Sequence, residues 1–206
     1  MKGIGGVLEG EVKLDEEFTR DSLKDTLRKR YGVVHIASHF QFQPGSDANS
    51  FLLLGDGSKY SLSEFRSSTN LFEGVQLLTL SACNTGVGDA GMGEGKEVEA
   101  FGALAQKKGA KAVVASLWPV ADQSTSLLMR EFYRIHESGA GVGKAEALRR
   151  AQLGLLRGSG QAAAGGERAL VLEKPGAAAP AFTAPKNAPH AHPYYWAPFF
   201  LMGNWL

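Results

Sequence analysis

The chain has 206 residues, enough for one α/β domain with a complete hydrophobic core. Its 22 Lys and Arg residues nearly balance 21 Asp and Glu residues, so a nucleic-acid partner is not expected. The single cysteine excludes an internal disulfide and favours a reducing compartment. Because the sequence has neither a signal-peptide core nor a bilayer-spanning apolar run, we expect a cytoplasmic protein without a membrane partner.

Strand-like and helix-like patterns alternate along the chain. Amphipathic spacing predicts helices at 18–30, 97–108, 124–136 and 144–156. Thr19 or Asp21 is expected to cap the first of them. Short apolar runs predict strands at 33–37, 51–54, 77–81, 112–117 and 194–203. Strands that are apolar nearly throughout, separated by helices, predict an α/β fold with a largely parallel sheet covered on both faces.

Two segments have the composition of loops. Residues 157–191 are rich in Ala, Gly and Pro, which predicts a mobile insertion within one domain and not a second domain. The glycine-rich stretch 85–95 predicts a flexible loop, which we expect at the mouth of a site.

One histidine and the single cysteine follow two of the predicted strands. His39 comes after the strand at 33–37, and Cys83 comes after the strand at 77–81. Functional side chains of parallel sheets gather at the carboxyl ends of strands, so the two residues are candidates for a base and a thiol nucleophile. From the residues alone, a lone cysteine is more often a small buried hydrophobic residue, and that alternative stays open.

Several motifs carry a resemblance to a known family. The segments VHIASHF at 34–40 and LTLSACNTG at 78–86 closely resemble the two active-site motifs of the CHAT family, which are caspase-like domains usually attached to tetratricopeptide repeats. The resemblance continues through GKEVE at 95–99, GAKAV at 109–113, SLWPVAD at 116–122 and HPYYW at 192–196. It implies a three-layer α/β/α caspase-like fold and a single CHAT domain over 1–206.

The resemblance also implies roles for individual residues. His39 matches the catalytic histidine and Cys83 the nucleophile, whereas His35 is expected to be structural. The backbone amides of Cys83 and Phe40 are the expected oxyanion donors, although relatives commonly have glycine where this chain has Phe40. No metal or cofactor is implied.

Asp122 is the candidate substrate-binding residue. The segment that ends at Asp122 resembles the corresponding segment of separase, a relative that cleaves after arginine. The resemblance implies a pocket in which the carboxylate favours Arg or Lys. An equally weighted alternative is that Asp122 caps the helix predicted at 124–136.

The resemblance leads to a first hypothesis and to rivals. The first is a cysteine endopeptidase that hydrolyses a protein or peptide substrate through a Cys-His dyad. The second is a regulated interaction module that keeps the fold but has little activity alone, and a cysteine transferase or amidase is a third. Tetratricopeptide repeats in the same or a partner chain are expected partners. CHAT domains are generally longer before the histidine, so we expect either a natural short form or the larger part of a longer domain.

Overall fold

The computed structural model describes residues 7–41, 43, 46–81, 83–84, 96–158 and 182–206, with only the backbone of 83–84 and 96–100. The helices, with η denoting a 3₁₀ helix, are η1 (Asp15–Glu17), α1 (Arg20–Arg28), α2 (Leu62–Ser67), α3 (Lys96–Lys107), α4 (Asp122–His136), α5 (Lys144–Arg157) and η2 (Pro193–Tyr195). The strands are β1 (Val33–Ile36), β2 (His39–Gln41), β3 (Phe51–Leu53), β4 (Lys59–Ser61), β5 (Leu77–Leu80), β6 (Cys83–Asn84), β7 (Ala112–Ser116) and β8 (Phe199–Gly203).

The main sheet has the strand order β1-β5-β7-β8. Strands β1, β5 and β7 are parallel, and β8 joins the edge of β7 in the antiparallel direction. All residues of β5 and β7 are buried, as expected of strands covered on both faces. The prediction of a mixed α/β fold with a largely parallel sheet is therefore confirmed.

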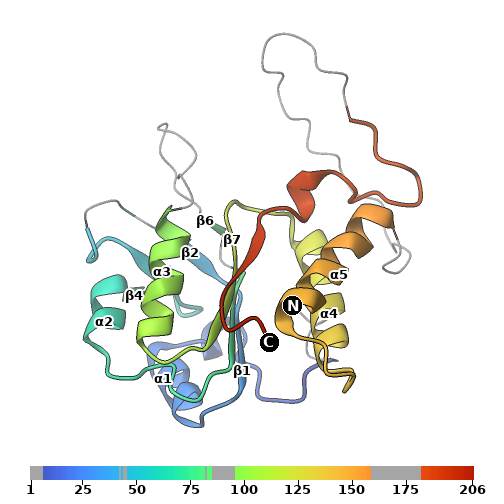
Figure 1. The fold of residues 1–206 in the computed structure, drawn as a ribbon. Coiled ribbons are helices and arrows are strands. Elements are labelled where there is room, and N and C mark those ends of the chain that lie inside the picture. Colours follow the sequence, from blue (N-terminus) through green and yellow to red (C-terminus); the bar gives the residue numbers. More distant parts are fainter. Residues whose placement is uncertain (1–6, 42, 44–45, 82, 85–95, 159–181) are drawn as a thin grey trace.

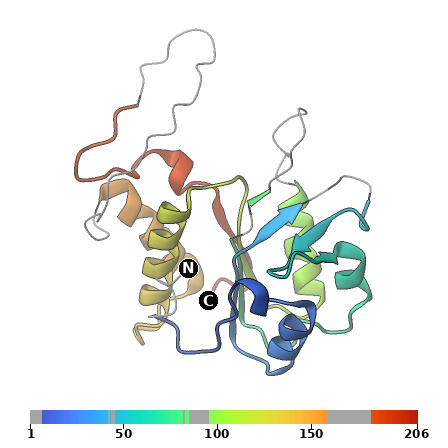
Figure 2. The ribbon, with the colours of Figure 1, turned by 180° about the vertical axis from the view of Figure 1, so that it is seen from behind.

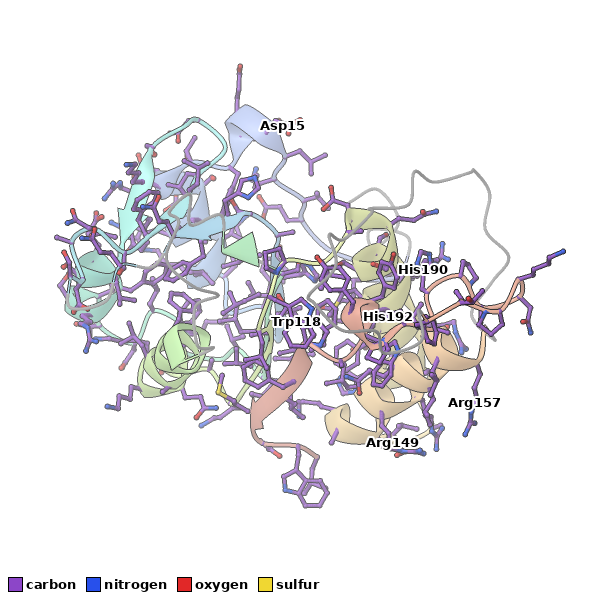
Figure 3. All side chains as sticks on the ribbon, turned by 90° about the horizontal axis from the view of Figure 1, so that it is seen from above. Asp15, Trp118, Arg149, Arg157, His190 and His192 are labelled. Atoms are coloured by element: carbon purple, nitrogen blue, oxygen red, sulfur yellow. The ribbon has the colours of Figure 1, made fainter. Side chains whose placement is uncertain are left out.

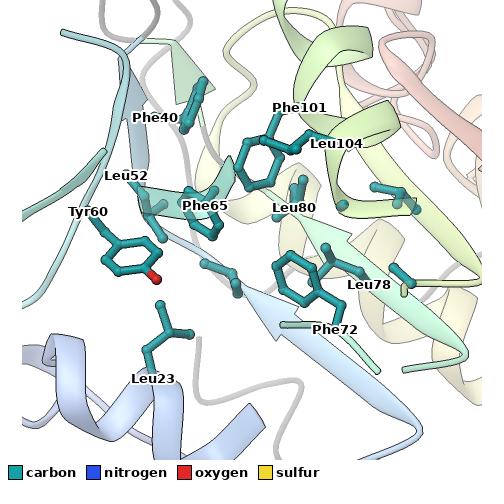
Figure 4. Packing of buried hydrophobic residues seen from close by; sticks show 14 of the residues in the cluster. Leu23, Phe40, Leu52, Tyr60, Phe65, Phe72, Leu78, Leu80, Phe101 and Leu104 are labelled. Atoms are coloured by element: carbon teal, nitrogen blue, oxygen red, sulfur yellow. The ribbon is translucent and has the colours of Figure 1, made fainter. Parts of the chain in front are cut away.

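Alternate residues of the central strands supply two hydrophobic cores. Leu78 and Val113 pack into a core with α1, α2 and α3, whereas Leu77 and Val114 pack into a second core with α4 and α5. Figure 1 accordingly shows α1, α2 and α3 on one side of the main sheet and α4 and α5 on the other, and Figure 2 shows the same from behind. Figure 4 shows the first core, in which Leu78 lies among aromatic side chains.

Helix α1 begins where its sequence pattern indicates. The Thr19 side chain accepts a hydrogen bond from the Ser22 amide, and the Ser22 hydroxyl accepts one from the Thr19 amide. This reciprocal cap satisfies two amides that the first turn leaves without helical partners. Thr19, and not Asp21, is thus the cap. Leu23 and Leu27, four residues apart, bury the apolar face of the helix.

A second, smaller sheet extends the first beyond the carboxyl ends of β1 and β5. Its strand order is β4-β3-β2-β6. Strand β2 begins three residues after β1 ends, and β6 begins three residues after β5 ends. Ile36 pairs with Leu80 and His39 pairs with Cys83, and both pairs are 44 positions apart (80 − 36 and 83 − 39). The parallel register of β1 and β5 therefore continues without a slip into β2 and β6.

The carboxyl-terminal segment differs in part from its prediction. The strand starts at Phe199, not at 194, because η2 occupies Pro193–Tyr195. The His192 side chain caps η2 by accepting a hydrogen bond from the Tyr194 amide, 3.1 Å away. Figure 3 shows His190 and His192 above the ends of α4 and α5, near Trp118.

The predicted insertion at 157–191 lies partly outside the described residues. Its last part is described, and there Ala188, His190 and Ala191 are buried. The predicted loop at 85–95 lies wholly outside the described residues. Among the described helices, none has the length and apolar character needed to cross a bilayer.

Candidate active site

His39 and Cys83 occupy directly paired positions on neighbouring parallel strands. His39 is the first residue of β2, Cys83 is the first residue of β6, and the two are Cα partners. Neighbouring strands lie about 4.8 Å apart, so the two backbones are as close as a sheet permits. The sequence predicted that both residues follow buried strands. The register of β1 and β5, which continues into β2 and β6, brings them to paired positions.

A cleft of about 270 Å³ opens beside His39. The His39 side chain is exposed, and the cleft runs from there to the start of α4. Its lining residues are His35, Ala37, Ser38, His39, Ser81, Ser116, Val120, Asp122, Thr125, Ser126 and Phe199. The polar side chains of this set are hydroxyl groups, two imidazoles and one carboxylate, which can bind a polar ligand within a largely apolar wall.

A chain of hydrogen bonds runs from the buried core to the wall of the cleft, where His35 and Ser81 lie. The Tyr133 hydroxyl donates to Thr79 Oγ1 at 2.6 Å. His35 Nδ1 lies 2.9 Å from the same Tyr133 oxygen, and His35 Nε2 lies 2.8 Å from Ser81 Oγ. Tyr133 and Thr79 are fully buried, and both nitrogens of the His35 ring have partners. This agrees with the expectation that His35 is structural.

Burial sets the charge state of this hydrogen-bonded chain. Desolvation lowers the pKa of His35 to about 4, so the ring is neutral at pH 7. Desolvation also raises the pKa of Tyr133 above its ordinary value of 10, an effect that the hydrogen bond to Thr79 opposes. This network is therefore uncharged at neutral pH.

Asp122 lies in the cleft and is not the N-cap of α4. The helix begins at Asp122 itself, and its N-cap is Ala121, which makes no side-chain capping bond. The alternative that Asp122 caps the helix is therefore wrong. Asp122, Thr125 and Ser126 all line the cleft, as the spacing i, i+3, i+4 along one helical face allows.

The segment before Asp122 is held in place by η2. Trp118 Nε1 donates to the Tyr194 carbonyl at 3.0 Å, and the Tyr194 hydroxyl donates to the Pro119 carbonyl at 2.7 Å. These two bonds join the β7–α4 connection to the carboxyl-terminal segment. They fix the backbone from which Asp122 enters the cleft.

The backbone amide of Phe40 is one of the two expected oxyanion donors, at a position where relatives commonly have glycine. Its side chain is buried and packs against Phe101, with ring centroids 5.0 Å apart and planes tilted by 56°. Phe40 does not line the cleft beside His39. The bulky side chain is therefore accommodated in the core and does not narrow this cleft.

Comparison with protein families matches residues 2–204 to the CHAT domain. The chain belongs to the CHAT domain family. The match covers nearly the whole sequence, as the motifs at 34–40 and 78–86 predicted. Comparison with curated proteins gives no match. In the part of this CHAT domain that the structure describes, no three His, Cys, Asp or Glu side chains group as a metal site requires.

Sequence reasoning missed several residues of the site. No sequence feature marked Ser81, Tyr133 or Thr79 as a site residue, because each is a residue type that is common in strands or helices. The position of Ser81, two residues before Cys83, was the one available hint. Tyr133 lies 98 positions from His35, so no local pattern connects the two.

Proposed function

We propose that this CHAT domain is a caspase-like cysteine endopeptidase that uses Cys83 as nucleophile and His39 as general base. The observation that carries the proposal is the direct register of Cys83 with His39, which lines a cleft that also contains polar side chains. Paired positions on neighbouring strands lie close enough for a base and a nucleophile to interact. Helices on both faces of the sheet support the three-layer α/β/α form of the caspase-like fold.

The proposed reaction has two halves. His39 takes the thiol proton, the Cys83 sulfur bonds to the scissile carbonyl carbon, and the C–N bond breaks as His39 returns the proton to the leaving amine. Water then attacks the thioester, with His39 accepting its proton, and releases the acid and the free thiol.

Backbone amides are the proposed stabilisers of the oxyanion. The amides of Cys83 and Phe40 are the candidates, as the family resemblance implies. Phe40 is in register with Leu52 of β3 and with Asn84 of β6. Its amide can therefore donate to the oxyanion only if it does not donate to a carbonyl of either strand.

Asp122 is the proposed recognition residue for the substrate side chain before the scissile bond. Its carboxylate lines the same cleft as His39. Asp122 is exposed at the edge of this cleft, and its carboxylate favours a cationic partner, which Arg or Lys supplies. The substrate proposed is therefore a protein or peptide with a basic residue before the cut.

Peptide hydrolysis and thiol labelling test the proposed activity. The wild-type protein is expected to hydrolyse fluorogenic peptides with Arg or Lys before the scissile bond. A peptidyl acyloxymethyl ketone is expected to alkylate Cys83, located by mass spectrometry of the digested protein. Hydrolysis of peptides with a different residue before the scissile bond would support the dyad but contradict the proposed role of Asp122. Neither turnover nor labelling would contradict the proposal and favour an interaction module that keeps the fold.

Substitution of the carboxylate tests the specificity pocket. Asp122→Asn is expected to lower kcat/KM for Arg and Lys peptides by about tenfold, because it removes the charge that pairs with the substrate cation. The matched control is Asp21→Asn, which also removes an acid from the first turn of a helix, in this case α1. Kinetics with a peptide series measures the change. An equal loss for basic and neutral peptides would argue against the pocket.

A further inference from the structure

The hydrogen bonds that lead from Tyr133 to the wall of the cleft have a fixed direction. The single proton of the Tyr133 hydroxyl is donated to Thr79, so the Tyr133 oxygen can only accept from His35. The proton of the neutral His35 ring therefore sits on Nδ1, and Nε2 keeps its lone pair. That lone pair accepts the Ser81 hydroxyl proton across 2.8 Å.

The direction of these hydrogen bonds affects the cleft through the Ser81 hydroxyl. With its proton directed to His35, the Ser81 oxygen turns its two lone pairs to the role of acceptor. Ser81 is partly exposed and lines the cleft together with Asp122. The site thus presents two acceptors, one neutral and one charged.

We propose that Tyr133 and His35 orient the Ser81 hydroxyl as a hydrogen-bond acceptor, so that Ser81 and Asp122 together bind the N–H groups of a cationic substrate side chain. Ser81 is then a specificity-determining residue, and His35 and Tyr133 are positioning residues that act through it. The inference rests on the proposed function, since it assumes that the cleft receives a substrate side chain.

The acceptor pair suits a guanidinium group best. Arginine carries five N–H donors in a planar fork and no acceptor, so it can serve two acceptors at once without an unfavourable contact. A glutamine or citrulline side chain brings a carbonyl oxygen, which the oriented Ser81 oxygen cannot satisfy. Arginine is therefore expected to be preferred over its neutral isostere citrulline for two separate reasons, the charge of Asp122 and the orientation of Ser81.

Two variants test the arrangement against substrates that differ in one group. The substrates are peptides with arginine or citrulline before the scissile bond. Ser81→Ala is expected to lower kcat/KM for the arginine peptide about tenfold and to leave the citrulline peptide nearly unchanged. Tyr133→Phe frees the His35 tautomer, and a smaller loss of about threefold in the arginine-to-citrulline ratio is expected.

The matched control is a buried tyrosine of the other core. Tyr60 is 1% exposed, and its hydroxyl lies 3.1 Å from Ser68 Oγ, so Tyr60→Phe removes the same kind of bond away from the cleft. Its arginine-to-citrulline ratio is expected to equal that of the wild type. If Ser81→Ala and Tyr133→Phe also keep the wild-type ratio while peptides are hydrolysed, the inference fails and the proposed function stands.

A second measurement does not depend on hydrolysis. In the ¹⁵N spectrum of the labelled protein, the His35 ring is expected to be neutral with its proton on Nδ1, the signal being assigned by its absence in His35→Gln. Tyr133→Phe is expected to remove this preference, and Tyr60→Phe to preserve it. A proton on Nε2 in the wild type would overturn the inference. Loss of hydrolysis for all peptides, with the Nδ1 proton present, would instead count against the proposed function and against a substrate role of Ser81.

Discussion

Replacing His39 with alanine is expected to lower kcat/KM for peptide hydrolysis by about 10³-fold. A free thiol has a pKa of about 8.5 and is largely protonated at neutral pH, so it needs a neighbouring base to become a nucleophile. His39 is the residue whose backbone position pairs with Cys83. Without the imidazole, the alkylation of Cys83 by a peptidyl ketone is expected to slow as well. Progress curves and labelling rates at pH 7 measure both effects.

Two further variants show whether the loss belongs to the dyad. Cys83→Ala removes the nucleophile and is expected to reduce hydrolysis at least about 10⁴-fold. His35→Gln changes the other histidine of the same motif, which bonds to Tyr133 and Ser81. Because His35 does not pair with Cys83, its loss is expected to cost no more than about tenfold, through Ser81. A His35 variant as inactive as His39→Ala would contradict the assignment of the base.

The main sheet was predictable because its strands are buried on both faces. An apolar run such as Leu77–Leu80 has no polar face, so its side chains are kept from water only between two layers of helices. The order of strands within the sheet has no such signal. It depends on which helices cover which face, and the antiparallel addition of β8 to β7 joins segments more than 80 residues apart (199 − 116 = 83).

The second sheet as a unit was not predicted: β3 lies within the strand expected at 51–54, but no strand was expected at β2, β4 or β6. Strand β6 has two residues and β2 has three, with no periodicity to detect. Their pairing follows from the register of β1 and β5, which is a tertiary property. The sequence could therefore bring His39 and Cys83 to the same edge of the sheet, but it could not place them at paired positions.

The role of Asp122 could not be decided without the start of α4. Asp122 lies two positions before the helix start expected at 124, and an aspartate just before a helix is a common cap. The structure begins the helix earlier, at Asp122, which releases the carboxylate from capping and leaves it in the cleft. A helix boundary is defined from sequence only to within one or two residues, which here is the difference between a cap and a cleft residue.

The stability of the domain is expected to fall by about 2 kcal/mol between pH 7 and pH 5 because of His35 alone. Burial lowers the pKa of His35 from 6.5 in the unfolded chain to about 4 in the folded protein. Between these values the unfolded state binds the extra proton, so acidification favours unfolding. Well above pH 6.5 the ring is neutral in both states, and this contribution to the pH dependence disappears.

Urea unfolding of the wild type and of His35→Gln at pH 7, 6 and 5 measures this contribution. The variant is expected to be less stable than the wild type at pH 7, since it disrupts the bonds to Tyr133 and Ser81, but its stability should fall less steeply towards pH 5. The range above pH 5 avoids the carboxylates whose pKa is lowered by ion pairs, Glu11 and Glu146, which lose their stabilising effect between pH 4.5 and about 2. Equal slopes for the two proteins would mean that the folded state accommodates a protonated His35. The Ser81 hydroxyl would then be free to donate into the cleft.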